Sequence, residues 1–203
     1  ITSDLPAVPS ICLGTADVSV YEMVGAYSAF ANKGVWTEPS YITHIEDKNG
    51  NILQEFVPRK VEAISEETAY LMLNLMQGVV QFGTGARLRG QYKFNNPIAG
   101  KTGTTQNQSD GWFMGITPEL VSGCWVGAED RSVHFRTLEL GQGARTAMPI
   151  WALYMQKIYA DKTLDISKGD FEAPKEPMSV ELNCDKYKLP GEDKSSSFDK
   201  DNF

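Results

Sequence analysis

The sequence predicts an α+β fold in which an antiparallel sheet is flanked by helices. Strand-like segments follow one another closely at residues 98–104, 112–116 and 120–126. Connections this short join antiparallel neighbours, because a parallel crossover needs a dozen or more residues. Apolar residues at helical spacing occupy the segments on either side of this meander, at residues 19–32, 65–81 and 147–160.

Local signals set the ends of these helices. Ser19 and Glu22 form a Ser-x-x-Glu capping box, and Gly34 follows the last turn of the first helix. Ser65 is the predicted N-cap of the second helix. Pro149 suits the first turn of the third, where a missing N–H removes no hydrogen bond. The apolar face expected on the second helix consists of Ala69, Met72, Leu75, Met76 and Val79.

Two further segments complete the expected organisation. The turn signal Asn49-Gly50 predicts a hairpin between residues 41–46 and 52–56. Residues 162–203 are rich in charged residues, Pro and Ser and lack apolar periodicity. We therefore predict a domain over residues 1–161, followed by a charged, partly disordered tail.

Composition excludes several classes of function. The net charge of -7 argues against a nucleic-acid partner, since such proteins carry basic patches. Cys12, Cys124 and Cys184 are odd in number and widely spaced, so they fit neither a disulfide framework nor a zinc site. His44 and His134 lack metal-type spacing. We expect no metal site and no cofactor.

The most informative segment is Lys101-Thr102-Gly103-Thr104. It combines a cation, two hydroxyls and a residue without Cβ in a predicted strand, which can hold a carboxylate and approach a reacting carbonyl. Lys-Thr-Gly is the third motif of penicillin-binding proteins and serine β-lactamases, after Ser-x-x-Lys and Ser-Asp-Asn. Alone it is weak evidence, because average residue usage produces it in about one chain of this length in twenty.

Further blocks in order and at matching spacing make the evidence specific. Over about residues 9–160 the chain resembles the transpeptidase domain of class A, bifunctional penicillin-binding proteins. The blocks are Leu13-Gly14-Thr15, Phe30-Ala31-Asn32-Lys33-Gly34, Glu67-Thr68-Ala69-Tyr70, Gln77-Gly78-Val79-Val80, Gly83-Thr84-Gly85, Ala99-Gly100-Lys101-Thr102-Gly103-Thr104-Thr105, Asp110-Gly111-Trp112-Phe113, Thr117-Pro118-Glu119-Leu120, Trp125-Val126-Gly127 and Pro149-Ile150-Trp151.

The chain departs from this family in its other two motifs. It contains no Ser-x-Asn, and its single Ser-x-x-Lys, at residues 197–200, is a chance match in the tail. We therefore expect this chain to be the C-terminal half of the domain, with the nucleophile upstream. Its sheet should then be incomplete, with an exposed face or edge that another contact covers. A smaller departure is Gly111, where the family more often has alanine.

The resemblance implies a reaction and a role for each residue. A serine attacks a stem peptide ending in D-Ala-D-Ala, and β-lactams mimic that donor. Lys101 is the expected catalytic and substrate-binding cation. The hydroxyls of Thr102 and Thr104 lie on one side of the strand and bind the terminal carboxylate. Gly103 allows close approach, and the Thr104 N–H is the second oxyanion donor. Alternation along the strand places Lys101 on the face opposite Thr102 and Thr104. The three side chains can reach one groove only if the strand is a twisted edge strand.

Other interpretations remain open. Threonine is common in strands for its β-propensity alone, and Gly83-Thr84-Gly85 either lines the groove or only makes a loop. Packing in the core and against helices, rather than contact with substrate, is the expected role of Trp112, Phe113, Trp125 and Trp151. The same fold serves serine β-lactamases and carboxypeptidases, which β-lactam turnover by the full-length protein would reveal. A non-catalytic interaction module is the third possibility, which an upstream Ser-x-x-Lys would exclude.

The resemblance also implies where the complete protein works. We expect an N-terminal membrane anchor and a glycosyltransferase domain upstream, and a location on the extracytoplasmic, periplasmic face of the membrane. No apolar run in this chain approaches the roughly 20 residues that a spanning helix needs.

Overall fold

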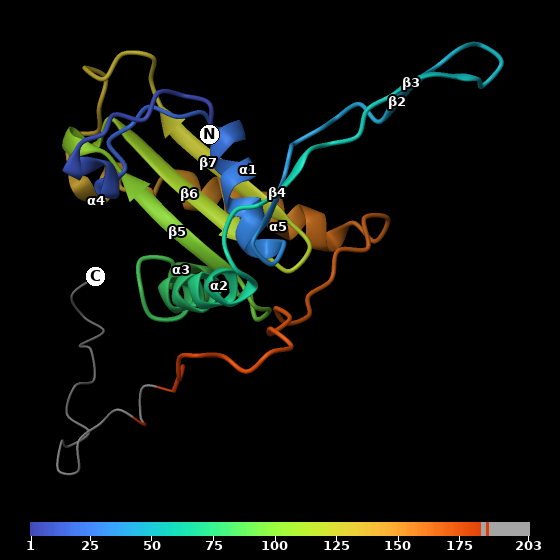
Figure 1. The fold of residues 1–203 in the computed structure, drawn as a ribbon. Coiled ribbons are helices and arrows are strands. Elements are labelled where there is room, and N and C mark those ends of the chain that lie inside the picture. Colours follow the sequence, from blue (N-terminus) through green and yellow to red (C-terminus); the bar gives the residue numbers. More distant parts are fainter. Residues whose placement is uncertain (184–185, 187–203) are drawn as a thin grey trace.

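The computed structural model describes residues 1–183 and 186, with an antiparallel sheet of three strands at its centre (Figure 1). The strands are β5 (Ala99–Thr104), β6 (Asp110–Ile116) and β7 (Val121–Gly127), in the order β5-β6-β7. This confirms the predicted meander. β6 begins before the predicted residue 112, because the N–H of Thr105 donates to the carbonyl of Asp110 and continues the pairing toward the turn.

Helices cover both faces of the sheet. α1 (Val20–Ala31) contacts β6 and β7, and α2 (Glu66–Gln81) contacts β5. Both contribute to one apolar cluster with the sheet, which contains Leu73, Met76, Ala99 and Ile116 with Tyr27 and Phe30 packed against it. α5 (Ala147–Ala160) lies behind β6 and β7 (Figure 1). Its cluster contains Val80, Leu88, Phe113, Met148 and Trp151.

The predicted helix signals are present. The hydroxyl of Ser19 accepts from the Glu22 N–H, and the Glu22 carboxylate accepts in return from the Ser19 N–H. The Ser65 hydroxyl accepts from the N–H of Thr68 at the start of α2. α5 has the predicted bounds.

The buried face of α2 differs from the predicted one. The buried residues are Ala69, Leu73, Met76 and Val80, whereas the side chain of Leu75 is 67% exposed. Leu75 lies two positions from Leu73, about 200° around the helix. The assignment of Leu75 to the core was wrong, because the apolar residues of this helix extend around more of its circumference than the sheet covers.

The predicted hairpin forms and projects from the body (Figure 1). Its strands are β2 (His44–Glu46) and β3 (Ile52–Glu55), with a register shift at Ile45 and Glu46. A second pair at its base, β1 (Val35–Thr37) with β4 (Lys60–Glu62), was not predicted. Three-residue strands leave too little alternation in the sequence to be recognised.

Short helices complete the described part of the chain. They are η1 (Pro9–Leu13), α3 (Arg87–Gly90), η2 (Gln106–Gln108) and α4 (Leu138–Gly141). Within the described residues, no helix has the length and apolar character needed to span a membrane.

Residues 162–183 have no helix or strand but contact the domain along their length. Glu172 pairs with Lys33 at 2.9 Å, and the Ser167 N–H donates to Glu119. The N–H and hydroxyl of Ser179 both donate to Glu67. The domain boundary at residue 161 stays a prediction. Cys184 and the Ser-x-x-Lys at residues 197–200 lie outside the described residues.

Candidate active site

The four residues of the Lys-Thr-Gly-Thr motif all lie on β5, which is an edge strand of the described sheet. Thr102 is opposite Phe113, whose ring packs at 5.1 Å against Trp151 of α5. Lys101 is opposite Met114, on the face that carries α1. The Cβ atoms of Thr102 and Thr104 therefore share the α5 side, and Lys101 starts from the other side.

The backbone N–H and C=O groups of successive β5 residues point alternately toward β6 and toward the open edge of the sheet. The N–H of Thr105 points to β6, because it donates to Asp110 at 3.2 Å. The carbonyl of Thr102 accepts a hydrogen bond from the Lys101 ammonium at 2.7 Å. Both observations fit one phase of the alternation. In that phase the carbonyl of Thr102 and the N–H of Thr104 point to the open edge.

Lys101 brings its charge to this edge despite starting on the opposite face. Its exposed side chain curls back to the carbonyl of the next residue, so the ammonium lies beside the backbone of Thr102. The long, flexible stem of lysine makes this path possible. The ammonium and the outward backbone groups are therefore neighbours.

Each threonine hydroxyl has a polar neighbour from another part of the chain. The Oγ1 of Thr102 lies 2.7 Å from the Oγ1 of Thr84. The Oγ1 of Thr104 accepts from the N–H of Gly143 at 3.1 Å. The sequence left two roles open for Thr84, which either lines the groove or only helps to form a loop. It did not identify Gly143 as a neighbour of the motif. These contacts join segments far apart in the chain, and no local pattern marks them.

Glycines let the segment before α5 approach β5 and β6 closely. A Cβ at Gly143 would lie 2.4 Å from the carbonyl oxygens of Gly103 and Trp112. A Cβ at Gly111 would lie 2.3 Å from the Oγ1 of Thr146. This contact explains the departure at Gly111, because the Thr146 hydroxyl fills the space that an alanine methyl group would need.

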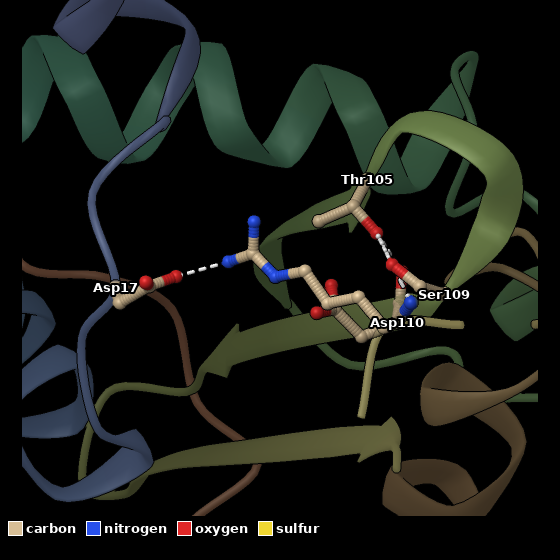
Figure 2. A network of polar contacts seen from close by, with 5 residues as sticks. Asp17, Thr105, Ser109 and Asp110 are labelled. Carbon is tan, nitrogen blue, oxygen red and sulfur yellow. Dashed lines mark hydrogen bonds and ion pairs between the residues drawn. The ribbon is translucent and has the colours of Figure 1, made fainter. Parts of the chain in front are cut away.

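A polar turn fixes the end of β5 (Figure 2). The Thr105 hydroxyl lies 2.9 Å from the Ser109 hydroxyl and accepts from the N–H of Asp110 at 3.0 Å. Nearby, Asp17 is ion-paired with Arg131, which ties the N-terminal segment to the loop after β7. The Oδ1 atom of Asp110 is buried and has no hydrogen-bond partner in the described part of the chain.

The aromatic residues divide between core and surface. Phe113 and Trp151 are buried as predicted, and the Trp151 indole N–H donates to Ser122 at 2.7 Å. Trp125 is 40% exposed, so its assignment to the core was wrong. It pairs with half-buried Trp112 near the end of the sheet, away from the part of β7 that Val24 of α1 covers.

Glu22 and Cys124 are two titratable groups outside the Lys-Thr-Gly-Thr motif whose pKa values are shifted by their surroundings. Hydrogen bonds from Ser19, Ser3 and Thr2 hold the pKa of the Glu22 carboxyl well below its usual range. Burial raises the pKa of the Cys124 thiol. Cys12 and Cys124 form no disulfide within the part of the chain that the structure describes. Among the described residues, no three His, Cys, Asp or Glu side chains gather as a metal site would require.

Comparison with known proteins places this arrangement in a family. Residues 8–123, more than half of the chain, match the model of the penicillin binding protein transpeptidase domain. Penicillin-binding protein 1A of Aquifex aeolicus is 34% identical over 174 residues, which are 86% of this chain and 23% of that protein.

Solved structures of penicillin-binding proteins have a similar fold. The crystal structure of penicillin-binding protein 1A from Haemophilus influenzae superposes with a TM-score of 0.68 at 28% identity, over 77% of this chain and 28% of that chain. PonA1 from Mycobacterium tuberculosis, solved in complex with penicillin V, has a TM-score of 0.64 at 23% identity, over 85% of this chain and 48% of that chain, a similarity of fold alone. The chain spans about a quarter of the length of its penicillin-binding protein 1A relatives. The α+β fold and these matches together show that the chain belongs to the penicillin-binding protein transpeptidase domain family.

Proposed function

We propose that this chain supplies one wall of the active site of a peptidoglycan D,D-transpeptidase. The observation that carries the proposal is the open edge of β5. There, the Lys101 ammonium lies beside the Thr102 carbonyl, and alternation turns the Thr104 N–H outward. A cation and an outward-facing N–H at this edge, with two hydroxyls on the adjoining α5 side of the strand, match what a substrate with a terminal carboxylate and a reacting carbonyl requires.

In this proposal each group has a defined task. A serine outside this chain attacks the penultimate carbonyl of a stem peptide ending in D-Ala-D-Ala and forms an acyl-enzyme, while the terminal D-Ala leaves with the proton that the serine gave up. An amine of a neighbouring stem peptide then attacks the ester, restores the serine and completes the cross-link. The Thr104 N–H donates to the oxyanion, a type of contact typically worth about 3–4 kcal/mol in the transition state.

Binding of the donor precedes that chemistry. Thr102 and Thr104 donate to the terminal carboxylate, and Lys101 adds positive charge beside it. Gly103 leaves room for the substrate backbone along the edge, so the donor peptide adds as a further strand. β-Lactams carry the same carboxylate and acyl group, and PonA1, a neighbour in fold, is described in complex with penicillin V.

The rival functions have less support. A serine β-lactamase uses the same motif, but the relatives that cover most of this chain are named as penicillin-binding proteins. A non-catalytic module fits the lack of Ser-x-Asn in the chain. We propose the catalytic function for the complete protein, and no acylation by the 203-residue chain alone.

The finer assignments are proposals of the same kind. We propose residues 1–161 as the C-terminal half of the transpeptidase domain and residues 162–203 as its tail. The complete protein would be a class A enzyme with a glycosyltransferase domain and a membrane anchor upstream. It would work on the extracytoplasmic face of the membrane.

A labelling experiment tests this proposal. Fluorescent penicillin is incubated with the full-length protein and with the 203-residue chain, followed by denaturing gels and intact mass. We expect a stoichiometric adduct on a serine upstream of Lys101 in the full-length protein, and none on the chain. An adduct on Ser197 of the chain, or none on the full-length protein, would contradict the proposal, and steady β-lactam turnover would favour a β-lactamase.

A further inference from the structure

The turn Gly83-Thr84-Gly85 makes a contact that the reaction scheme above does not use. We propose that Thr84 is a positioning residue, which acts through Thr102 to direct a hydroxyl proton at the substrate carboxylate. The proposal deepens the transpeptidase function and rests on it. The observation behind it is the 2.7 Å distance between the Oγ1 atoms of Thr84 and Thr102.

The backbone fixes the position of Thr84. The N–H groups of Gly83 and Gly85 both donate to the carbonyl of Val79, at 3.1 and 3.0 Å. A Cβ on either glycine would come within about 3.1 Å of Val79 backbone atoms. The turn is thus wound tightly against the last turn of α2. Thr84 therefore reaches β5 from a turn that is held against α2.

The number of protons and lone pairs on each hydroxyl determines which hydrogen bonds Thr84 and Thr102 can make. A threonine hydroxyl has one proton to donate and two lone pairs to accept with. At Thr104 the Gly143 N–H occupies a lone pair, so the Thr104 proton stays available for another acceptor. At Thr102 the same state arises when Thr84 is the donor of the shared hydrogen bond.

A bound carboxylate favours the arrangement in which Thr84 donates to Thr102, because an ionised carboxylate only accepts hydrogen bonds and so needs the Thr102 proton. Thr84 then donates to Thr102, and Thr102 donates to the carboxylate. Hydrogen bonds in such a chain polarise and strengthen one another. The Gly143 N–H plays the corresponding part for Thr104. The strand therefore presents two hydroxyl donors, and their hydrogen bonds to a charged carboxylate are stronger than those to a neutral ester or amide.

The test is acylation of the full-length protein by benzylpenicillin and by its neutral methyl ester. In Thr84→Val, which keeps the side-chain shape but removes the hydroxyl, we expect benzylpenicillin acylation to fall about tenfold, as loss of one hydrogen bond in a charged contact implies. Ester acylation should change by less than about twofold, so the acid-to-ester ratio falls. Thr84→Ser should restore the ratio. Thr43→Val, on the projecting hairpin, is the matched control.

A double variant separates positioning from a structural role. If Thr84 acts through Thr102, adding Thr84→Val to Thr102→Val should cost no further acylation, because the acceptor of its proton is already gone. Equal losses for the acid and the ester, or additive losses in the double variant, would overturn the inference while wild-type acylation stands. Absence of acylation in the wild-type protein would overturn the proposed function as well. Thermal unfolding of each variant, with Thr84→Ser as the folded reference, identifies losses that come from misfolding.

Discussion

The ammonium of Lys101 donates a 2.7 Å hydrogen bond to the carbonyl of Thr102, its neighbour on β5. The two side chains leave opposite faces of the sheet, as the register with Met114 and Phe113 requires. The curled lysine nevertheless places its charge where the backbone of Thr102 opens to the edge. A substrate carboxylate that arrives there would replace this neutral carbonyl acceptor with a charged one, so the ammonium would exchange its carbonyl contact for an ion pair.

Gly143→Ala should destabilise the fold. The new Cβ would lie 2.4 Å from the carbonyl oxygens of Gly103 and Trp112, which are backbone atoms within the sheet. We expect the free energy of unfolding in urea to fall by about 1–3 kcal/mol, as overpacking typically costs. Gly78→Ala is the matched control, because nothing outside its own helix lies within 4 Å of the new methyl group. It should gain about 0.5–1 kcal/mol. Equal stability of the two variants would refute the close approach.

The burial pattern of α2 predicts different costs for two nearby leucines. Leu73 is 5% exposed and Leu75 is 67% exposed. Leu73→Ala should lower the free energy of unfolding by about 2–5 kcal/mol, as cavities in a core do. Leu75→Ala should change it by no more than about 0.5 kcal/mol. A larger loss at Leu75, measured by the same denaturation, would reinstate the helical face expected from the sequence.

Glu22 should contribute a pH-dependent part of stability. Its pKa is lowered in the folded chain by hydrogen bonds from Ser19, Ser3 and Thr2, whereas an unfolded glutamate titrates near pH 4.3, about its usual value. The stabilisation is therefore fully present above the unfolded pKa and is lost as pH falls toward the folded value. Relative to Glu22→Gln, wild type should be more stable at pH 7, and the difference should shrink below about pH 4. Glu62→Gln, on exposed β4, is the control. A pH-independent difference would show that protonation of Glu22 is not involved.

The sequence predicted the elements whose signals are local. The capping box at Ser19, the cap at Ser65 and the turn at Asn49-Gly50 depend on residues a few positions apart, and the structure contains each of them. The meander was predictable because its connections are short. Leu75 and Trp125 were misplaced, since apolar residues alone do not reveal which part of a helix or strand its neighbours cover.

The site was predictable only along the strand. Lys101 to Thr104 are recognisable as a motif, and their alternation follows from the strand period. The contacts of Thr84 with Thr102 and of Gly143 with Thr104 join segments separated by 18 and 39 residues. Tertiary packing alone creates such pairs, and the curl of Lys101 likewise depends on the open edge beside it.

The most direct test of the proposed edge-strand site is penicillin acylation of the full-length protein carrying Lys101→Ala. The charge beside the carboxylate disappears while the strand keeps its backbone, so we expect the acylation rate to fall about a hundredfold or more. Circular dichroism and the melting temperature should stay close to wild type, because the Lys101 side chain is exposed. Lys48→Ala, in the hairpin turn, should acylate normally. Unchanged acylation of a folded Lys101→Ala protein would contradict the role assigned to this edge.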